Sequence, residues 1–236
     1  MKSLNWIVDE LSVPSNRKGV IIMAIINQEN LNSLMASFNS SLINIQTTIQ
    51  NGNTTFGQDL AAVWESKTAQ ETAGKIDEAI NGLWTAYKTC LSDLWDGIKT
   101  NVDNYNKFNK GEVVLQKIND MAGDVSKIQE YIKNKFGDGD EGLKDGKSAA
   151  DAGKVLDRIV TDVESEINSS AASISGCGAF DADETKAVSD AIKACVLVLK
   201  GKMGEIATEV GTTLTTVDTQ AAQLKSTNIG NMSIGS

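Results

Sequence analysis

Apolar residues recur every three or four positions along most of the chain, and this spacing places them on one face of an α-helix. One stripe lies within a first helix that we expect over residues 29–50, and its spacing continues as far as Val63. A second, very long helix is expected over residues 68–108. The turn-forming sequence Asn51-Gly52-Asn53 predicts an interruption of the first helix, as a kink or as an end.

The same periodicity continues in the second half of the chain. Asp181 and Glu184 have the spacing of a capping box and should begin the last helix. Residues 228–236 are mostly small and polar, so we expect a frayed tail there. The pattern therefore predicts three more helices, over residues 112–136, over residues 148–173, and from a turn at 176–179 to about Lys225.

These elements predict an all-α protein of long antiparallel helical hairpins that form a bundle, with no β-sheet. Each hairpin has one aromatic residue in its short turn, Trp64 in the first and Phe180 in the second. A lone hairpin would expose its apolar stripe, so two hairpins should bury each other, which favours a monomer. The expected organisation is a leader at 1–22, a hairpin at 23–110, a third helix and linker at 111–147, and a second hairpin with its tail at 148–236.

Composition and charge exclude several classes of function. The chain has no histidine, which removes the commonest general base and the commonest neutral metal ligand. A net charge of −9 argues against nucleic acid as a partner. Phosphate-binding loops and nucleophile constellations are also missing from the sequence. We therefore expect no enzymatic activity, no catalytic residues, no cofactor and no bound metal.

An acidic cluster near the middle of the chain raises the possibility of a calcium loop. It lacks the glycine at the sixth position and the glutamate at the twelfth position of such a loop. We interpret it as a solvated, glycine-rich linker. The cluster consists of Asp138, Asp140, Glu141 and Asp145.

The three cysteines are an odd number without metal-binding or CxxC spacing, and they do not indicate a disulfide framework. Cys90 and Cys195 lie on or beside apolar stripes, where a free cysteine behaves as a small buried hydrophobe. Cys177 stands between two glycines in a predicted turn, so it is the cysteine that we expect to be exposed.

The first residues do not have the pattern of a secretory signal peptide or of a transmembrane helix. The apolar run at residues 20–26 is far shorter than the roughly 20 residues that span a membrane, and no small-residue cleavage site follows it. Codons for Lys18-Gly19-Val20 can include a ribosome-binding sequence shortly before the codon of Met23. Translation that starts at Met23, with residues 1–22 absent from the native protein, is therefore a hypothesis.

Several motifs in the first hairpin occur in one order and at suitable spacing. Residues 23–31 read Met-Ala-Ile-Ile-Asn-Gln-Glu-Asn-Leu, the turn Trp64-Glu65-Ser66 follows the first helix, and Ala69 opens a helix that reaches Tyr105. Together they make residues 23–108 similar to the WXG family, the ESAT-like substrates of type VII (ESX) secretion. Ser66 stands where the family has glycine, and Asn109 stands where its export motif has an acidic residue four positions after a tyrosine.

The resemblance implies a non-enzymatic protein of a Gram-positive bacterium that acts through contacts with a protein partner or with the secretion machinery. It also implies secretion without a conventional signal peptide, or a cytoplasmic location before export. The second hairpin would be a diverged copy of the first. The candidates for hairpin-turn or interaction residues are Trp64, Glu65, Ser66, Trp84, Trp95, Tyr105 and Phe180.

Other interpretations of the same residues remain open. Trp64 can equally cap a hydrophobic core, and Trp84 and Trp95, which share one helix face, can widen a buried stripe or form a docking surface. A helical pore-forming toxin is an alternative function, although its best apolar segment, residues 194–199, is short. A structural protein of a phage or of the cell envelope is another.

Overall fold

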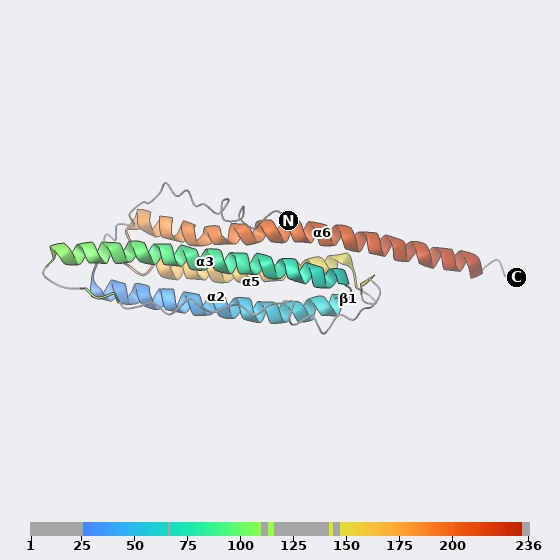
Figure 1. The fold of residues 1–236 in the computed structure, drawn as a ribbon, viewed down its shortest axis with the longest axis horizontal. Coiled ribbons are helices and arrows are strands. Elements are labelled where there is room, and N and C mark those ends of the chain that lie inside the picture. The colour runs from blue at the N-terminus through green and yellow to red at the C-terminus, as the bar shows by residue number, and fades with distance from the viewer. Residues whose placement is uncertain (1–25, 66, 110–112, 116–141, 144–146, 233–236) are drawn as a thin grey trace. The chain divides into compact units, whose positions relative to one another are not determined.

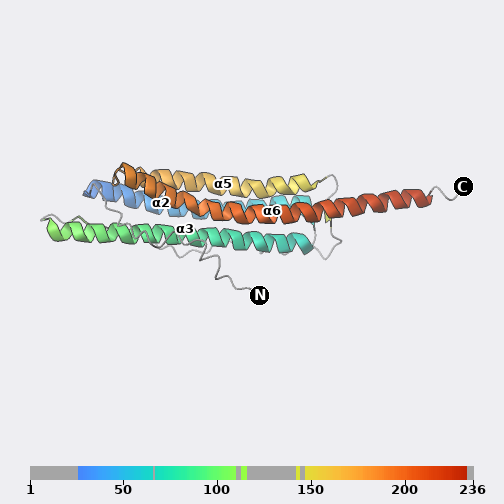
Figure 2. The same ribbon diagram turned by 90° about the horizontal axis from the view of Figure 1, so that it is seen from above.

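The computed structural model describes residues 26–65, 67–109, 113–115, 142–143 and 147–232 (Figure 1). The leader, Met23, Ser66, the acidic cluster and nearly all of the predicted helix at 112–136 lie outside these residues. Within the described part of the chain, the predicted all-α fold is confirmed. It contains four helices that pack against each other: α2 (Gln28–Val63), α3 (Lys67–Phe108), α5 (Ala149–Ser175) and α6 (Ala182–Met232) (Figure 2).

The predicted interruption of the first helix is wrong, because α2 continues through Asn51-Gly52-Asn53 to Val63. Its apolar stripe does not break there, since Ile49 and Phe56 on either side are both buried. Burying one such side chain contributes about 1.5–3 kcal/mol, whereas a glycine within a helix costs about 1 kcal/mol relative to alanine. A Cβ atom added at Gly52 would lie 3.8 Å from the Ile159 side chain, so α5 packs closely at this glycine. Packing therefore outweighs the local preference for a turn.

The last helix is also longer than predicted. We expected α6 to end near Lys225 and residues 228–236 to fray, but the helix extends to Met232. The single proline of the chain is Pro14, so the segment contains no residue that stops a helix outright. Once a helix exists, each further turn forms far more easily than the first, which explains the extension.

Side-chain caps begin both helices of the second hairpin. The Asp181 amide donates to the Glu184 carboxylate (2.9 Å) and the Glu184 amide donates to the Asp181 carboxylate (2.9 Å), as the sequence spacing predicts. At the start of α5 the cap is one-sided, because the Ser148 amide (3.0 Å) and the Ser148 hydroxyl (2.8 Å) both donate to the Asp151 carboxylate. These bonds satisfy amides that have no partner within the helix, and they fix where each helix starts.

The turn between α5 and α6 is tied to the start of α2. Gly178 has a φ of 83°, a backbone conformation that glycine adopts without a steric penalty. Its carbonyl accepts a hydrogen bond from the Asn30 side-chain amide at 2.8 Å. The turn is therefore held in place by a residue that lies far away in the sequence.

The chain divides into two compact units, and each of the four helices contributes one segment to each unit. Unit 1 contains the start of α2, the end of α3, the end of α5 and the start of α6, so α2 and α6 run in one direction within it and α3 and α5 run in the other. Unit 2 contains the four complementary segments. The helical segments of unit 1 are 28–48, 82–108, 163–175 and 182–199, and those of unit 2 are 49–63, 67–81, 149–162 and 200–232.

Each unit has its own apolar core, drawn from the stripes that the sequence predicts. In unit 1 the fully buried side chains include Leu34, Phe38, Leu91, Ile98, Ile167 and Ile192. In unit 2 they include Ile49, Leu60, Ile76 and Ile80. Both cores combine residues of both hairpins, so neither hairpin folds around a core of its own.

A two-residue ladder joins the first hairpin turn to a later loop. Strand β1 (Trp64–Glu65) pairs antiparallel with strand β2 (Gly142–Leu143), with Trp64 opposite Leu143 and Glu65 opposite Gly142. Among the described residues this is the extent of β-structure. Two residues on each side make a local bridge between loops and do not form a layer of the fold.

Removing the capping box of α6 should destabilise the protein measurably. We expect Asp181→Ala to lower the free energy of unfolding by about 1 kcal/mol, because the Glu184 amide loses its acceptor. The control is Asp190→Ala within the same helix, which should cost no more than about 0.5 kcal/mol. Urea denaturation measures both variants, and equal losses would contradict a specific role for the cap.

Candidate functional site

The predicted interaction residues are not gathered in one place. Trp64 and Glu65 belong to unit 2, where their backbones form β1, and Ser66 lies outside the described residues. The remaining candidates, Trp84, Trp95, Tyr105 and Phe180, all belong to unit 1. The first hairpin thus turns in unit 2 and the second turns in unit 1.

The two tryptophans of α3 pack against neighbouring side chains. Trp84 is buried and stacks on Tyr87 with a ring-centroid distance of 6.2 Å, while the Lys88 ammonium lies 5.3 Å from its ring. Trp95 is half-buried and tilts against Phe38 of α2 at 5.5 Å. Both indole rings therefore contribute to the packing of unit 1, as expected if they widen the apolar stripe of α3.

Tyr105 and Phe180 lie at segment ends in unit 1. Tyr105 is half-buried in the last turn of α3, and its carbonyl accepts hydrogen bonds from the Asn109 backbone amide (3.0 Å) and side-chain amide (2.9 Å). Asn109 occupies the position where the family's export motif has an acidic residue. Its two hydrogen bonds cap the C-terminal end of α3. Phe180 is buried beside the turn before α6, where it covers the end of the core.

Two side-chain amides hold the chain after α3 against unit 1. The Gln28 side chain accepts from the Val114 amide (2.8 Å) and donates to the Val114 carbonyl (3.0 Å). The Asn106 side chain likewise accepts from the Val113 amide (3.0 Å) and donates to the Val113 carbonyl (2.9 Å). Residues 113–115, which we had assigned to the start of a third helix, are irregular as a result.

A polar group interrupts the apolar core of unit 1. The Tyr87 hydroxyl of α3 lies 2.5 Å from the Ser170 hydroxyl of α5, and both side chains are buried. Ser41 of α2 is a buried polar residue of the same unit. Burial raises the pKa of Tyr87 well above its ordinary value. Because the phenol and its partners are shielded from water, the hydrogen bonds within the group are worth more than they would be on the surface.

Cys90 of α3 and Cys195 of α6 both belong to unit 1. The Cys195 thiol donates to the Ala191 carbonyl of its own helix at 3.8 Å. The predicted burial is confirmed for Cys195, whereas Cys90 is half-buried. Cys177 is also half-buried and not exposed as predicted, and burial raises the pKa of its thiol.

The polar group was not predicted because its members are far apart in the sequence. Tyr87 and Ser170, for example, are separated by 83 positions. A weak signal was present, because Ser41 and Ser170 each follow a buried apolar residue by three positions and so extend a stripe. Only the packing of the two hairpins shows that these positions meet.

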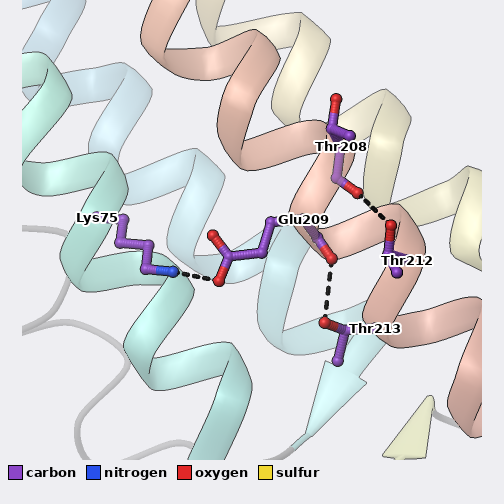
Figure 3. Close-up of polar contacts among 5 residues, drawn as sticks. All are labelled: Lys75, Thr208, Glu209, Thr212 and Thr213. Carbon is purple, nitrogen blue, oxygen red and sulfur yellow. Dashed lines mark hydrogen bonds and ion pairs between the residues drawn. The ribbon is translucent and has the colours of Figure 1, made fainter.

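Unit 2 has exposed ion pairs between the hairpins, of which Figure 3 draws Lys75–Glu209, and a surface furrow on α6. Lys75 of α3 pairs with Glu209 of α6, and Arg158 of α5 pairs with Asp59 of α2 at 2.8 Å. All four side chains are substantially exposed, so each pair contributes about 0–1 kcal/mol. They support the register of the helices more than they stabilise the fold.

The furrow on α6 does not have the character of a ligand site. Its threonine hydroxyls donate to carbonyls of their own helix, such as Thr212 to Thr208 (3.0 Å, Figure 3) and Thr215 to Gly211 (2.7 Å). The hydroxyls are therefore already satisfied within the helix. Its lining comes from one helix alone: Ala207, Thr208, Gly211, Thr212, Thr215, Thr216 and Thr219.

The described residues contain no group of three or more His, Cys, Asp or Glu side chains that could hold a metal ion. None of the described helices combines the length and the apolar character that a membrane crossing requires. No protein-family model, no curated protein and no solved structure matches this chain.

The Tyr87 hydrogen bond should contribute measurably to stability. We expect Tyr87→Phe to lower the free energy of unfolding by about 1–2 kcal/mol at pH 7, because the buried Ser170 hydroxyl loses its partner. The control is Tyr105→Phe, for which no side-chain hydrogen bond of the hydroxyl is seen and which should cost about 0.5 kcal/mol or less. Thermal and urea denaturation test the difference, and equal losses would contradict it.

The same pair predicts a dependence of stability on pH. The pKa of Tyr87 is raised in the folded protein, so its stabilising contribution is complete below the unfolded pKa of about 10 and is lost as pH rises above that value. The loss can reach about 1.4 kcal/mol per pH unit. The stability advantage of the unmutated protein over Tyr87→Phe should therefore shrink between pH 10 and pH 11. A constant difference over this range would contradict the prediction.

Proposed function

We propose that the chain is a non-enzymatic, WXG-like substrate or partner of type VII secretion that acts through protein contacts. The observation that carries the proposal is the turn at Trp64. There α2 ends at Val63 and α3 begins at Lys67, so the Trp64-Glu65-Ser66 motif connects two long helices. A helical hairpin with this motif in its turn is the pattern of the family that residues 23–108 resemble.

The lengths and packing of the helices support the proposal. α2 has 36 residues and α3 has 42, and their apolar faces are buried against α5 and α6. The second hairpin thus covers the apolar faces of the first, as the proposed tandem arrangement requires. The Tyr87–Ser170, Lys75–Glu209 and Asp59–Arg158 contacts all link the first hairpin to the second.

A self-contained pair of hairpins would leave other surfaces available for a partner. Ile43 of α2 and Leu197 of α6 are large apolar residues of unit 1 that are 54% and 68% exposed. Single exposed apolar residues are common on protein surfaces, so they identify no interface by themselves. We propose a protein partner or the secretion machinery as the binding partner, and we propose no nucleic-acid partner.

Export should depend on the type VII secretion ATPase of the native host. We expect the protein in culture supernatants of the parent strain and its loss from supernatants when the ATPase gene is deleted, with cellular levels maintained. A cytoplasmic marker protein controls for lysis. Equal extracellular amounts in both strains, or none in either, would remove the proposed function. Leakage of liposomes caused by the purified protein would favour a pore-forming toxin instead.

The turn motif can be tested in the same assay with a matched pair of substitutions. Trp64→Phe should reduce export, because it changes the residue that the family motif contributes at the turn. Trp95→Phe removes an indole that packs on Phe38 within unit 1 and should leave export unchanged. Circular dichroism and thermal denaturation establish that both variants fold. Equal export of the two variants would show that Trp64 in the turn is not required for secretion.

The packing of both hairpins in one chain predicts a monomer. Light scattering after size exclusion should give the mass of one chain, 25.2 kDa, over a wide range of concentrations. Such a result is expected because the second hairpin already covers the apolar faces of α2 and α3. An obligate dimer would show that the two hairpins of one chain do not bury each other's apolar faces.

A further inference from the structure

The exposed face of α2 in unit 1 carries no charged side chain. Residues 31–58 contain no Asp, Glu, Lys or Arg, although 22% of the chain is charged. Depletion of charge marks the centre of an interface, whereas a helix face in water usually carries charged residues. Within unit 1 the uncharged face consists of the exposed residues Asn32, Ala36, Ser40, Ile43 and Thr47.

Polar groups on the uncharged face already have partners within α2. The Asn32 side-chain oxygen accepts from the Gln28 side-chain amide at 2.9 Å, and the Ser40 hydroxyl donates to the Ala36 carbonyl at 2.7 Å. Covering a polar group is costly mainly when it is left without a hydrogen bond. An apolar stripe can therefore cover this face, where Ile43 is 54% exposed.

The described chain breaks off beside one end of α2 and resumes beside the other. At the first residue of α2, the Gln28 side chain accepts from the Val114 amide at 2.8 Å. Beyond the last helical residue, Val63, Glu65 pairs with Gly142 in the β-ladder. Residues 116–141 therefore connect the start of α2 to its end.

The length of this connection leaves little freedom in its path. α2 has 36 residues, so its ends are about 54 Å apart measured along the helix. The apolar periodicity predicts a helix as far as residue 136, followed by the glycine-rich linker. A helix from residue 115 to 136 and an extended chain from there to Gly142 would together advance about 50 Å. The connection has almost no spare length and has to follow α2.

We propose that residues 115–132 dock along the uncharged face of α2 through their apolar stripe. Both segments advance about 1.5 Å per residue and run in the same direction, so Ile43 lies level with Ile128 when Val114 lies beside Gln28. The proposal concerns packing within one chain and does not depend on export. The stripe consists of Leu115, Ile118, Ala122, Val125, Ile128 and Ile132.

The exposed apolar residue of α6 is a poorer position for the same stripe. Leu197 is 68% exposed, but Lys193 and Lys200, four positions before it and three positions after it, are exposed on the same helix face. An apolar stripe laid over Leu197 would take these ammonium groups out of water, which is costly. Leu197 is therefore a matched control for Ile43, because both are large apolar residues exposed on helices of unit 1.

Hydrogen exchange of the full chain, followed by mass spectrometry, tests the proposal. Amides of residues 116–135 in the unmutated protein should exchange far more slowly than those of a free chain. Ile43→Lys should accelerate their exchange about ten- to a hundredfold, because the docked segment loses the burial of one large apolar side chain. Leu197→Lys should leave their exchange unchanged. Peptides from the middle of α3 report whether each variant keeps the fold.

Two further variants keep the test independent of one substitution. Ile128→Lys, on the docking segment, should accelerate exchange of residues 116–135 as Ile43→Lys does. Ile43→Ser leaves the face uncharged and should produce a smaller acceleration. Free-chain exchange of residues 116–135 in the unmutated protein would overturn the proposal, and so would equal effects of Ile43→Lys and Leu197→Lys.

Light scattering separates the docking segment from a second copy of the chain as the occupant of the face. The mass of the unmutated protein and of Ile43→Lys should stay that of one chain at all concentrations. A mass that rises with concentration in the unmutated protein, and does not rise in Ile43→Lys, would show a second copy on the uncharged face. That result would overturn the proposal.

Discussion

The structure depends on the burial of four apolar stripes against one another. No single hairpin can satisfy this requirement, because a pair of helices leaves one side of its stripes in water. Each fully buried Leu, Ile or Phe contributes about 1.5–3 kcal/mol, whereas exposed ion pairs such as Lys75–Glu209 contribute about 0–1 kcal/mol. The cores of the two units therefore determine the fold, and the surface charges adjust it.

The polar side chains within the core restrict how the helices can pack. Apolar stripes tolerate sliding of one helix along another, but a displaced Tyr87 hydroxyl would lose Ser170 and stay buried without a partner. Leaving a buried polar group unsatisfied costs about 1–3 kcal/mol, so shifted registers are penalised. The Asn101 side-chain nitrogen of α3 is buried and has no hydrogen-bond partner among the described residues.

Much of the helical structure could be predicted from local sequence. Periodic apolar residues located α3 and α5 to within two residues, and the spacing of Asp181 and Glu184 predicted the cap of α6. The failures came where tertiary packing outweighs local preference. Asn51-Gly52-Asn53 remains helical because α5 packs against α2 there, and residues 113–115 are irregular because Gln28 and Asn106 bind their backbone.

The candidate site was less predictable for a related reason. Trp84 and Trp95 could be placed on one helix face from their spacing, but the partners that they contact could not. The contact of Tyr87 with Ser170 links residues of different hairpins. A single sequence contains no record of such pairs, because periodicity describes one helix and not its neighbours.

The composition of the two units has a consequence for synthesis on the ribosome. Unit 1 requires residues 28–48 together with residues 182–199, and unit 2 requires the end of α6. At about 10 residues per second, the first hairpin would wait on the order of ten seconds for its covering helices. During that interval its apolar faces are available to chaperones, so the timing of translation decides how long the nascent chain needs protection.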